Sequence, residues 1–213
     1  MIITGVTICC VDGVSDDVKN LQSINAIIES IENIDFESKI FISPKLNSGL
    51  EKLLKDNNIK HIEIEKKDYC QYNEFLLKYL TNYIKTNHVL IVQSDGYVVN
   101  PDMWDYNFLN FDYIGAPWPL HRQIIDGVDI RVGNGGFSLR SKKLLDIFNI
   151  HEIDTKDPNG LCHEDVIICV HKRKELQDKG IKFAEVDVAS KFSREIWCHD
   201  SVEKPFGFHL LKP

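Results

Sequence analysis

The sequence lacks the features that mark a nucleic-acid-binding, secreted or membrane-spanning protein. Its 213 residues hold 25 Lys and Arg against 32 Asp and Glu, a formal net charge of −7, whereas nucleic acids are bound by basic surfaces. No stretch approaches the roughly 18 apolar residues of a membrane-spanning helix, and the first residues show no signal peptide. We therefore expect no nucleic-acid partner, no transmembrane segment and a cytoplasmic location, for a whole protein or a domain of a longer one.

The sequence also lacks the cysteine patterns that would predict a metal site or a disulfide framework. The six cysteines are scattered, and none forms a Cys-x-x-Cys pair. Three of them lie within apolar runs and are expected to be buried thiols. No Ser-His-Asp or Cys-His arrangement suggests a covalent nucleophile.

The first hundred residues alternate between strand and helix patterns. Apolar runs predict strands at 5–12, 39–43, 59–64 and 89–95, and apolar residues at helical spacing predict helices at 18–31, 50–54 and 72–83. Four such alternations predict an α/β fold with a mostly parallel central sheet flanked by helices. Beyond residue 100 the helical patterns give way to aromatic residues and turns. We expect one domain over 1–213, with a nucleotide-binding half at 1–100 and an irregular acceptor-binding, catalytic half at 101–213.

The stretch from Val89 to Tyr97 is the most informative one. Four apolar, mostly β-branched residues run into Gln93, Ser94, Asp95 and Gly96, which is typical of a central strand buried on both faces. Asp95 is therefore expected at the carboxyl edge of the sheet, where open α/β sheets bind ligands. The alternative is that the Asp-Gly pair only makes a turn.

Three later segments also carry candidate site residues. Gly135 and Gly136 precede a short predicted strand and would let a ligand approach the backbone, although a plain Gly-Gly turn is the commoner case. Glu164 and Asp165 precede an apolar helix, where a carboxylate could be a general base or only a helix cap. His209 stands between Phe208 and Leu210, a setting in which a histidine is more often structural than a ligand.

Aromatic residues gather between residues 97 and 119. Trp118 lies in the segment Tyr113-Ile-Gly-Ala-Pro-Trp118. These rings could stack on sugars at an acceptor site, or they could simply belong to the core.

The order of these segments resembles that of the GT-A-fold glycosyltransferases. A strand-end Asp is followed by Gly-Gly-Phe-Ser, by Glu-Asp and by a late His. The resemblance is to inverting enzymes such as the β-1,4-galactosyltransferases. It extends to small glycosyltransferase-like proteins that carry the segments Tyr113-Ile-Gly-Ala-Pro-Trp118 and Gly133-Asn-Gly-Gly-Phe-Ser-Leu-Arg140. It implies a GT-A-like, Rossmann-like sheet and transfer of a sugar from a nucleotide-sugar donor, with UDP expected, to a glycan or other hydroxyl acceptor.

The resemblance also implies roles for individual residues. Asp95 matches the last Asp of the Asp-x-Asp metal motif, and His209 matches the late His that completes the site for Mn²⁺ or Mg²⁺. Gln93 stands where the motif has its first Asp, which is a departure from the pattern. Asp165 matches the base that deprotonates the acceptor. The expected ligand-contacting residues are Glu164 at donor or acceptor hydroxyls, Asp12 under the nucleoside, Gln93, Asn134, Gly135 and Gly136 near the donor, and Trp118 on the acceptor side.

Two other functions remain open from the sequence. A sugar nucleotidyltransferase would need a basic, glycine-rich loop after the first strand, but the loop 12–17 is acidic and has one glycine. A carbohydrate-binding domain without catalysis would keep the aromatic residues and tolerate Gln93. Hydrolysis of a UDP-sugar would distinguish an enzyme from such a domain.

Overall fold

The computed structural model describes residues 2–119, 124–125, 128–129, 131–156, 160, 162–195 and 202–210. The strands are β1 (Ile2–Val11), β2 (Asp35–Ser43), β3 (Lys60–Glu63), β4 (His88–Ile91), β5 (Tyr113–Ile114), β6 (Ile124–Ile125), β7 (Val128–Asp129), β8 (Ser138–Ser141), β9 (Ser193–Arg194) and β10 (Gly207–Phe208). The α-helices are α1 (Asp17–Ile31), α2 (Ser48–Asp56), α3 (Tyr69–Glu74), α4 (Lys142–Ile150), α5 (Glu164–Val166), α6 (Arg173–Asp178) and α7 (Val186–Phe192).

Six strands form the central sheet in the order β3-β2-β1-β4-β8-β5. The four strands of the first half, β1 to β4, pair in parallel, whereas β8 is antiparallel to both β4 and β5. The predicted α/β fold with a mostly parallel sheet is confirmed. Because β8 and β5 come from the second half of the chain, the sheet joins the two predicted halves.

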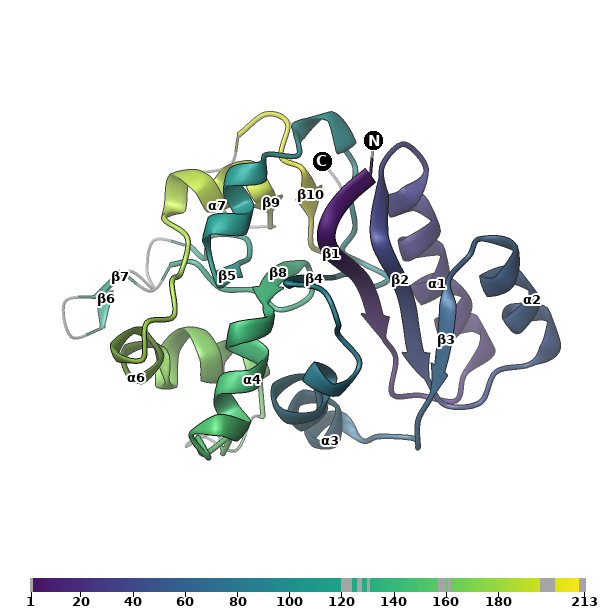
Figure 1. Ribbon diagram of the computed structural model, residues 1–213, viewed down its shortest axis with the longest axis horizontal. Helices are drawn as coiled ribbons and strands as arrows, with labels where there is room; N and C mark the ends of the chain where they lie inside the picture. Colours follow the sequence, from purple (N-terminus) through teal and green to yellow (C-terminus); the bar gives the residue numbers. More distant parts are fainter. Residues whose placement is uncertain are drawn as a thin grey trace.

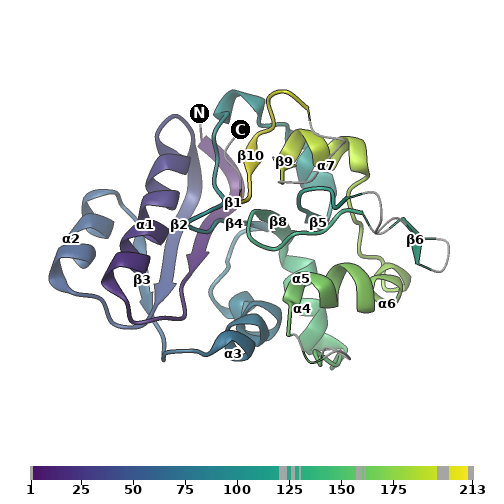
Figure 2. The ribbon, with the colours of Figure 1, turned by 180° about the vertical axis from the view of Figure 1, so that it is seen from behind.

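The central position of β4 follows from its composition. Val89, Leu90, Ile91 and Val92 are completely buried, so side chains on both faces of the strand pack against apolar neighbours. Helices α1 and α2 cover the face of the sheet that is turned toward the viewer in Figure 2. In Figure 1 the arrowheads of β1 and β2 point toward the bottom of the view, where α3 lies.

Two helices begin at polar residues whose side chains cap them. The side chain of Asp16 accepts hydrogen bonds from the backbone N–H groups of Val18 and Lys19 at the start of α1. Ser141 accepts one from Leu144 N–H at the start of α4. Both contacts satisfy N–H groups that have no partner within the helix.

The helix predicted at 72–83 is not a single α-helix. Helix α3 passes into a π-helical segment, η1 (Phe75–Tyr79), and then a 3₁₀ turn, η2 (Leu80–Asn82). Likewise, a π-helical segment, η6 (Ile167–His171), separates α5 from α6. Each wide turn buries three consecutive residues, 75–77 and 167–169, which the narrower stripe of a regular helix would not do.

The described part of the chain contains no helix long and apolar enough to cross a membrane. Directly after β4 the chain forms two short 3₁₀ segments, η3 (Pro101–Met103) and η4 (Tyr106–Asn110).

The thiols of Cys9, Cys10 and Cys169 are buried, as the apolar runs predict. Burial raises the pKa of all three thiols, which keeps them protonated.

Candidate active site

Three chain segments bring site residues to one edge of the sheet. Asp12 follows directly after β1, and the turn 93–96 follows β4, closed by hydrogen bonds of 2.9 and 3.0 Å between the backbones of Gln93 and Gly96. Strand β8 is antiparallel to β4, so the residues before it, Gly135 and Gly136, lie at this same edge. The predicted edge position of Asp95 is confirmed, with the Asp at the tip of a tight turn rather than within the strand.

The larger of two pockets at this edge has a volume of about 480 Å³. Its lining residues come from the ends of β1 and β4, from α1 and from the start of α3: Cys10, Val11, Asp12, Gly13, Val14, Lys19, Gln22, Ser23, Lys67, Asp68, Tyr69, Tyr72, Gln93, Ser94 and Asp95. Lys19 and Lys67 place two cations beside the predicted nucleotide site. The carboxylate of Asp12 accepts hydrogen bonds from Val14 N–H at 3.1 Å and Ser23 Oγ at 3.0 Å, which fixes the loop after β1.

The smaller pocket has a volume of about 200 Å³ and holds the catalytic candidates. It is lined by Tyr69, Tyr72, Asn73, Gln93, Asn134, Gly135, Gly136, His163, Glu164, Asp165, Glu195 and His209. Tyr69, Tyr72 and Gln93 line both pockets, and Gln93 Nε2 donates a hydrogen bond to Tyr72 Oη at 2.9 Å. The two pockets therefore share one wall.

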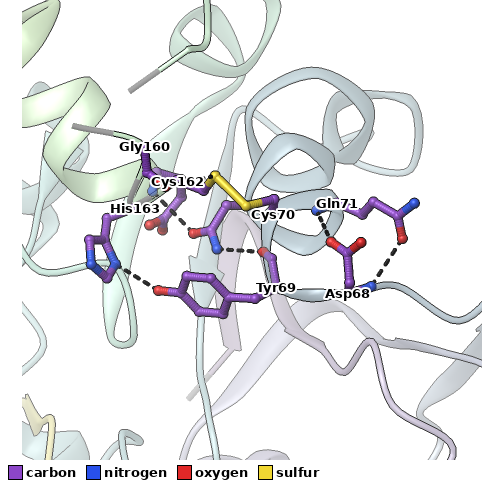
Figure 3. Close-up of a disulfide and its surroundings, with 9 residues drawn as sticks. Asp68, Tyr69, Cys70, Gln71, Gly160, Cys162 and His163 are labelled. Carbon is purple, nitrogen blue, oxygen red and sulfur yellow. Dashed lines mark hydrogen bonds between the residues drawn. A yellow bond between two sulfur atoms is a disulfide. The ribbon is translucent and has the colours of Figure 1, made fainter. Parts of the chain in front are cut away.

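A disulfide links the two segments that form this part of the site. Cys70 in α3 is bonded to Cys162, 92 residues later in the chain (Figure 3). Next to it, Tyr69 Oη lies 2.6 Å from His163 Nδ1, and Glu164 N–H donates to Asn73 Oδ1 at 3.1 Å. The bond and its two neighbouring contacts hold the Glu164–Asp165 pair against the shared wall. Nothing in the spacing of the six cysteines indicates this pairing.

Glu164 is held by a buried ion pair. Arg140 Nη2 lies 2.5 Å from Glu164 Oε1, and the side chains are 0% and 7% exposed. The second carboxylate oxygen accepts a hydrogen bond from Asp165 N–H. A side chain at position 135 would collide with the Glu164 carboxylate, so Gly135 is required for this packing. Arg140 was not among the predicted site residues.

The environment of Asp165 suits a general base. Burial and the adjacent Glu164 carboxylate raise the pKa of Asp165 to about 6, although the Val166 N–H bond, Arg140 and His163 act in the opposite direction. The positive end of a helix dipole favours the ionised form of a carboxylate at a helix start, but desolvation is the stronger effect here. A base of this pKa is still largely ionised at neutral pH and binds a proton more strongly than an ordinary Asp.

His209 lies where the sequence predicts, beside Asp95. Its Nε2 atom is 3.7 Å from Asp95 Oδ1, and its Nδ1 atom is 2.9 Å from Asn134 Nδ2 and 3.4 Å from Glu195 Oε1. A side chain at position 136 would overlap the His209 ring. The second glycine therefore leaves the space that the imidazole occupies.

These residues do not complete a site for the expected Mn²⁺ or Mg²⁺. Asp95 supplies a carboxylate, but the residue two positions before it is Gln93, whose amide is bound to Tyr72. Among the described residues, no three His, Cys, Asp or Glu side chains are grouped so that they could hold a cation. The Nδ1 atom of His209 is already engaged with Asn134 Nδ2 at 2.9 Å, so Nε2 is the ring atom that would have to bind the metal.

Residues 57–209 match the model of a protein family described as "Protein of unknown function (DUF5672)". The chain belongs to the DUF5672 family. No curated protein matches the chain.

The solved structures that resemble this DUF5672 protein include glycosyltransferases. One is the galactosyltransferase LgtC in complex with donor and acceptor sugar analogues, with a TM-score of 0.58 and 14% identity over 97% of this chain and 87% of that chain. Another is a glycosyltransferase involved in glycosylation of the major capsid of PBCV-1, with a TM-score of 0.53 and 14% identity over 96% and 92% of the two chains. At this identity the likeness concerns the fold: the DUF5672 chain has the GT-A glycosyltransferase fold.

Nine of the ten predicted site residues line the two pockets of this DUF5672 protein: Asp12, Gln93, Asp95, Asn134, Gly135, Gly136, Glu164, Asp165 and His209. Trp118 lines neither pocket, and the structure favours the alternative that its ring belongs to the core. The Trp118 side chain is only 6% exposed, and its ring fills the space beside Gly133. Most of the aromatic stretch is core, with Trp104, Phe108 and Tyr113 also buried.

Proposed function

We propose that this chain is a glycosyltransferase that moves a sugar from a nucleoside diphosphate sugar, with UDP as the expected nucleotide, to a hydroxyl group of a glycan or other acceptor. The observation that carries the proposal is the pair of pockets that share Tyr69, Tyr72 and Gln93. One has two lysines and room for a nucleotide, and the other has a carboxylate base. The GT-A fold of the chain supports the same function.

Asp165 is the proposed general base. The hydroxyl proton of the acceptor passes to Asp165 as the acceptor oxygen bonds to the anomeric carbon. The bond from that carbon to the diphosphate breaks, and its electron pair leaves with the phosphate oxygen. A direct displacement of this kind inverts the anomeric centre, and the chain need not supply a nucleophile.

The other residues bind and orient the two substrates in this proposal. Lys19 and Lys67 neutralise charge on the nucleotide, as positively charged groups do for leaving phosphates. Glu164, fixed by Arg140, has lone pairs left to accept hydrogen bonds from sugar hydroxyls. The expected Mn²⁺ or Mg²⁺ is given no step here, because the described side chains do not complete its ligand set.

The test is release of UDP from a panel of UDP-sugars, with and without candidate acceptors. Asp165→Asn should lower transfer by about 10²–10⁴-fold and leave UDP binding unchanged, because the base contacts the acceptor. Asp178→Asn in α6, outside both pockets, is the matched control and should transfer normally. NMR of the product should show the inverted anomeric configuration.

Two outcomes would contradict the proposal. If Asp165→Asn transfers as fast as the unmodified protein, Asp165 is not the base. If the protein binds free glycans but neither binds UDP nor cleaves any UDP-sugar, it is a carbohydrate-binding domain rather than a transferase.

A further inference from the structure

The two ring nitrogens of His209 face different kinds of group. Nδ1 lies between the amide of Asn134, at 2.9 Å, and the carboxylate of Glu195, at 3.4 Å. Nε2 faces the site, with Asp95 Oδ1 at 3.7 Å. A neutral imidazole carries one ring proton, so one nitrogen donates a hydrogen bond and the other accepts. The neighbours of Nδ1 decide which it is.

The side-chain amide of Asn134 can be oriented in only one way without the loss of a buried hydrogen bond. The backbone N–H of Gly136 donates to Asn134 Oδ1 at 3.0 Å, and Asn134 is 2% exposed. Turning the amide over would set this N–H against an NH₂ group, and a buried donor without an acceptor is costly. Tyr113 Oη also donates a hydrogen bond to the backbone carbonyl oxygen of Asn134 at 2.8 Å, and the residue has a left-handed backbone conformation with φ of 68°. Nδ2 of the amide therefore faces His209.

An NH₂ group facing Nδ1 makes Nδ1 the acceptor of this hydrogen bond. The ring proton of neutral His209 then resides on Nε2, where it blocks the lone pair that would bind a cation. Glu195 favours the opposite form, with the proton on Nδ1, but its oxygen is 0.5 Å farther away than the Asn134 nitrogen (3.4 − 2.9). Gln93 fits the same picture, because an amide replaces the carboxylate that a metal site would use there.

We propose that His209 acts as a hydrogen-bond donor, through Nε2–H, to the diphosphate of the donor sugar, and that it does not bind a metal ion. Asn134 is a positioning residue that sets the tautomer. The proposal rests on the nucleotide-sugar function above for its ligand, but the tautomer itself does not. Negative charge on the leaving diphosphate is then met by Nε2–H together with the lysines of the larger pocket.

Nitrogen-15 NMR of the intact protein reads the tautomer directly, at a pH above which the ring signals of His209 no longer change. The His209 signals are assigned by their loss in His209→Gln. The proposal expects a protonated Nε2 and an unprotonated Nδ1. In Asn134→Asp a carboxylate oxygen replaces the NH₂ group, so the proton should move to Nδ1. Asp also tolerates the left-handed backbone. A ring protonated on Nδ1 in the unmodified protein overturns the proposal.

Titration with Mn²⁺ alone provides a second, independent readout. Unmodified protein and His209→Gln should bind Mn²⁺ equally weakly, whereas Asn134→Asp, with its freed Nε2 lone pair, should bind about 10–100-fold more tightly. The double variant Asn134→Asp/His209→Gln carries the same added charge and should lose that gain. If His209→Gln alone lowers Mn²⁺ affinity tenfold, His209 is a metal ligand and the proposal is wrong.

The diphosphate is tested by UDP binding in EDTA. His209→Ala should weaken binding by about tenfold, as expected for one hydrogen bond to a charged group. Equal binding would overturn the assigned ligand. Absence of any sugar transfer would count against the enzyme function, but it would leave the NMR and Mn²⁺ results standing, so the two failures are distinguishable.

Discussion

Replacing both Cys70 and Cys162 by Ala removes the covalent link between α3 and the segment that carries Glu164 and Asp165. The two cysteines are 92 residues apart. For a loop of that length, the entropy that a cross-link removes from the unfolded chain corresponds to about 4.6 kcal/mol at 25 °C. In a chain of this size, each kcal/mol changes the melting temperature by roughly 2–4 °C. We therefore expect the double variant to melt about 9–18 °C lower.

Urea and thermal unfolding with and without a reductant measure this effect. Reductant should destabilise the unmodified protein and leave the double variant unchanged, since the variant has no disulfide to lose. The single variants Cys70→Ala and Cys162→Ala should each be as destabilised as the double variant, because either change breaks the same bond. A loss of unfolding free energy below about 1 kcal/mol would refute the loop-entropy argument. Equal sensitivity of both proteins to reductant would refute the role of this disulfide.

The remaining predictions concern the two pockets. The pKa of Asp165 is about 6 in the folded protein, against about 3.9 in an unfolded chain. The folded state therefore binds the proton more strongly. This contribution to stability is fully present below pH 4 and is lost as the pH rises through 6. At pH 8 Asp165→Asn should thus be more stable than the unmodified protein, by at most on the order of 3 kcal/mol, and equally stable at pH 3.5 in urea unfolding. The transfer rate of the unmodified protein should fall by half near pH 6 as its base is protonated. Gly136→Ala should displace His209, because the added methyl group would overlap the imidazole ring, and should weaken UDP binding in calorimetry.

The fold could be predicted largely because β1 and β4 are buried on both faces. Such strands must consist of unbroken apolar runs, and those runs are visible in the sequence. The direction of β8 could not be predicted, since pairing with β4 depends on contacts distant in the chain. The helix at 72–83 was placed correctly, but its π-helical turn was not, because three adjacent buried residues give no distinct periodic signal.

The candidate site residues could be predicted only where a distinctive residue type stands at the end of a recognisable strand. Asp95 and the two glycines are of this kind. Arg140, by contrast, has the sequence appearance of an ordinary strand residue, and only the fold reveals that it binds Glu164. The Cys70–Cys162 bond joins positions that the sequence does not relate. Such bonds persist mainly in oxidising compartments. The disulfide is therefore an argument against the cytoplasmic location, which stays a prediction.

The wall that the two pockets share has a consequence for inhibition. Tyr69, Tyr72 and Gln93 line both pockets. A single molecule that reaches past these three side chains could therefore occupy both pockets at once. Once one half of such a molecule is bound, a short tether would hold the other half near its pocket at millimolar effective concentration. Two weak fragments joined across this wall could therefore bind far more tightly than either alone, and selectivity would come from the length of the tether.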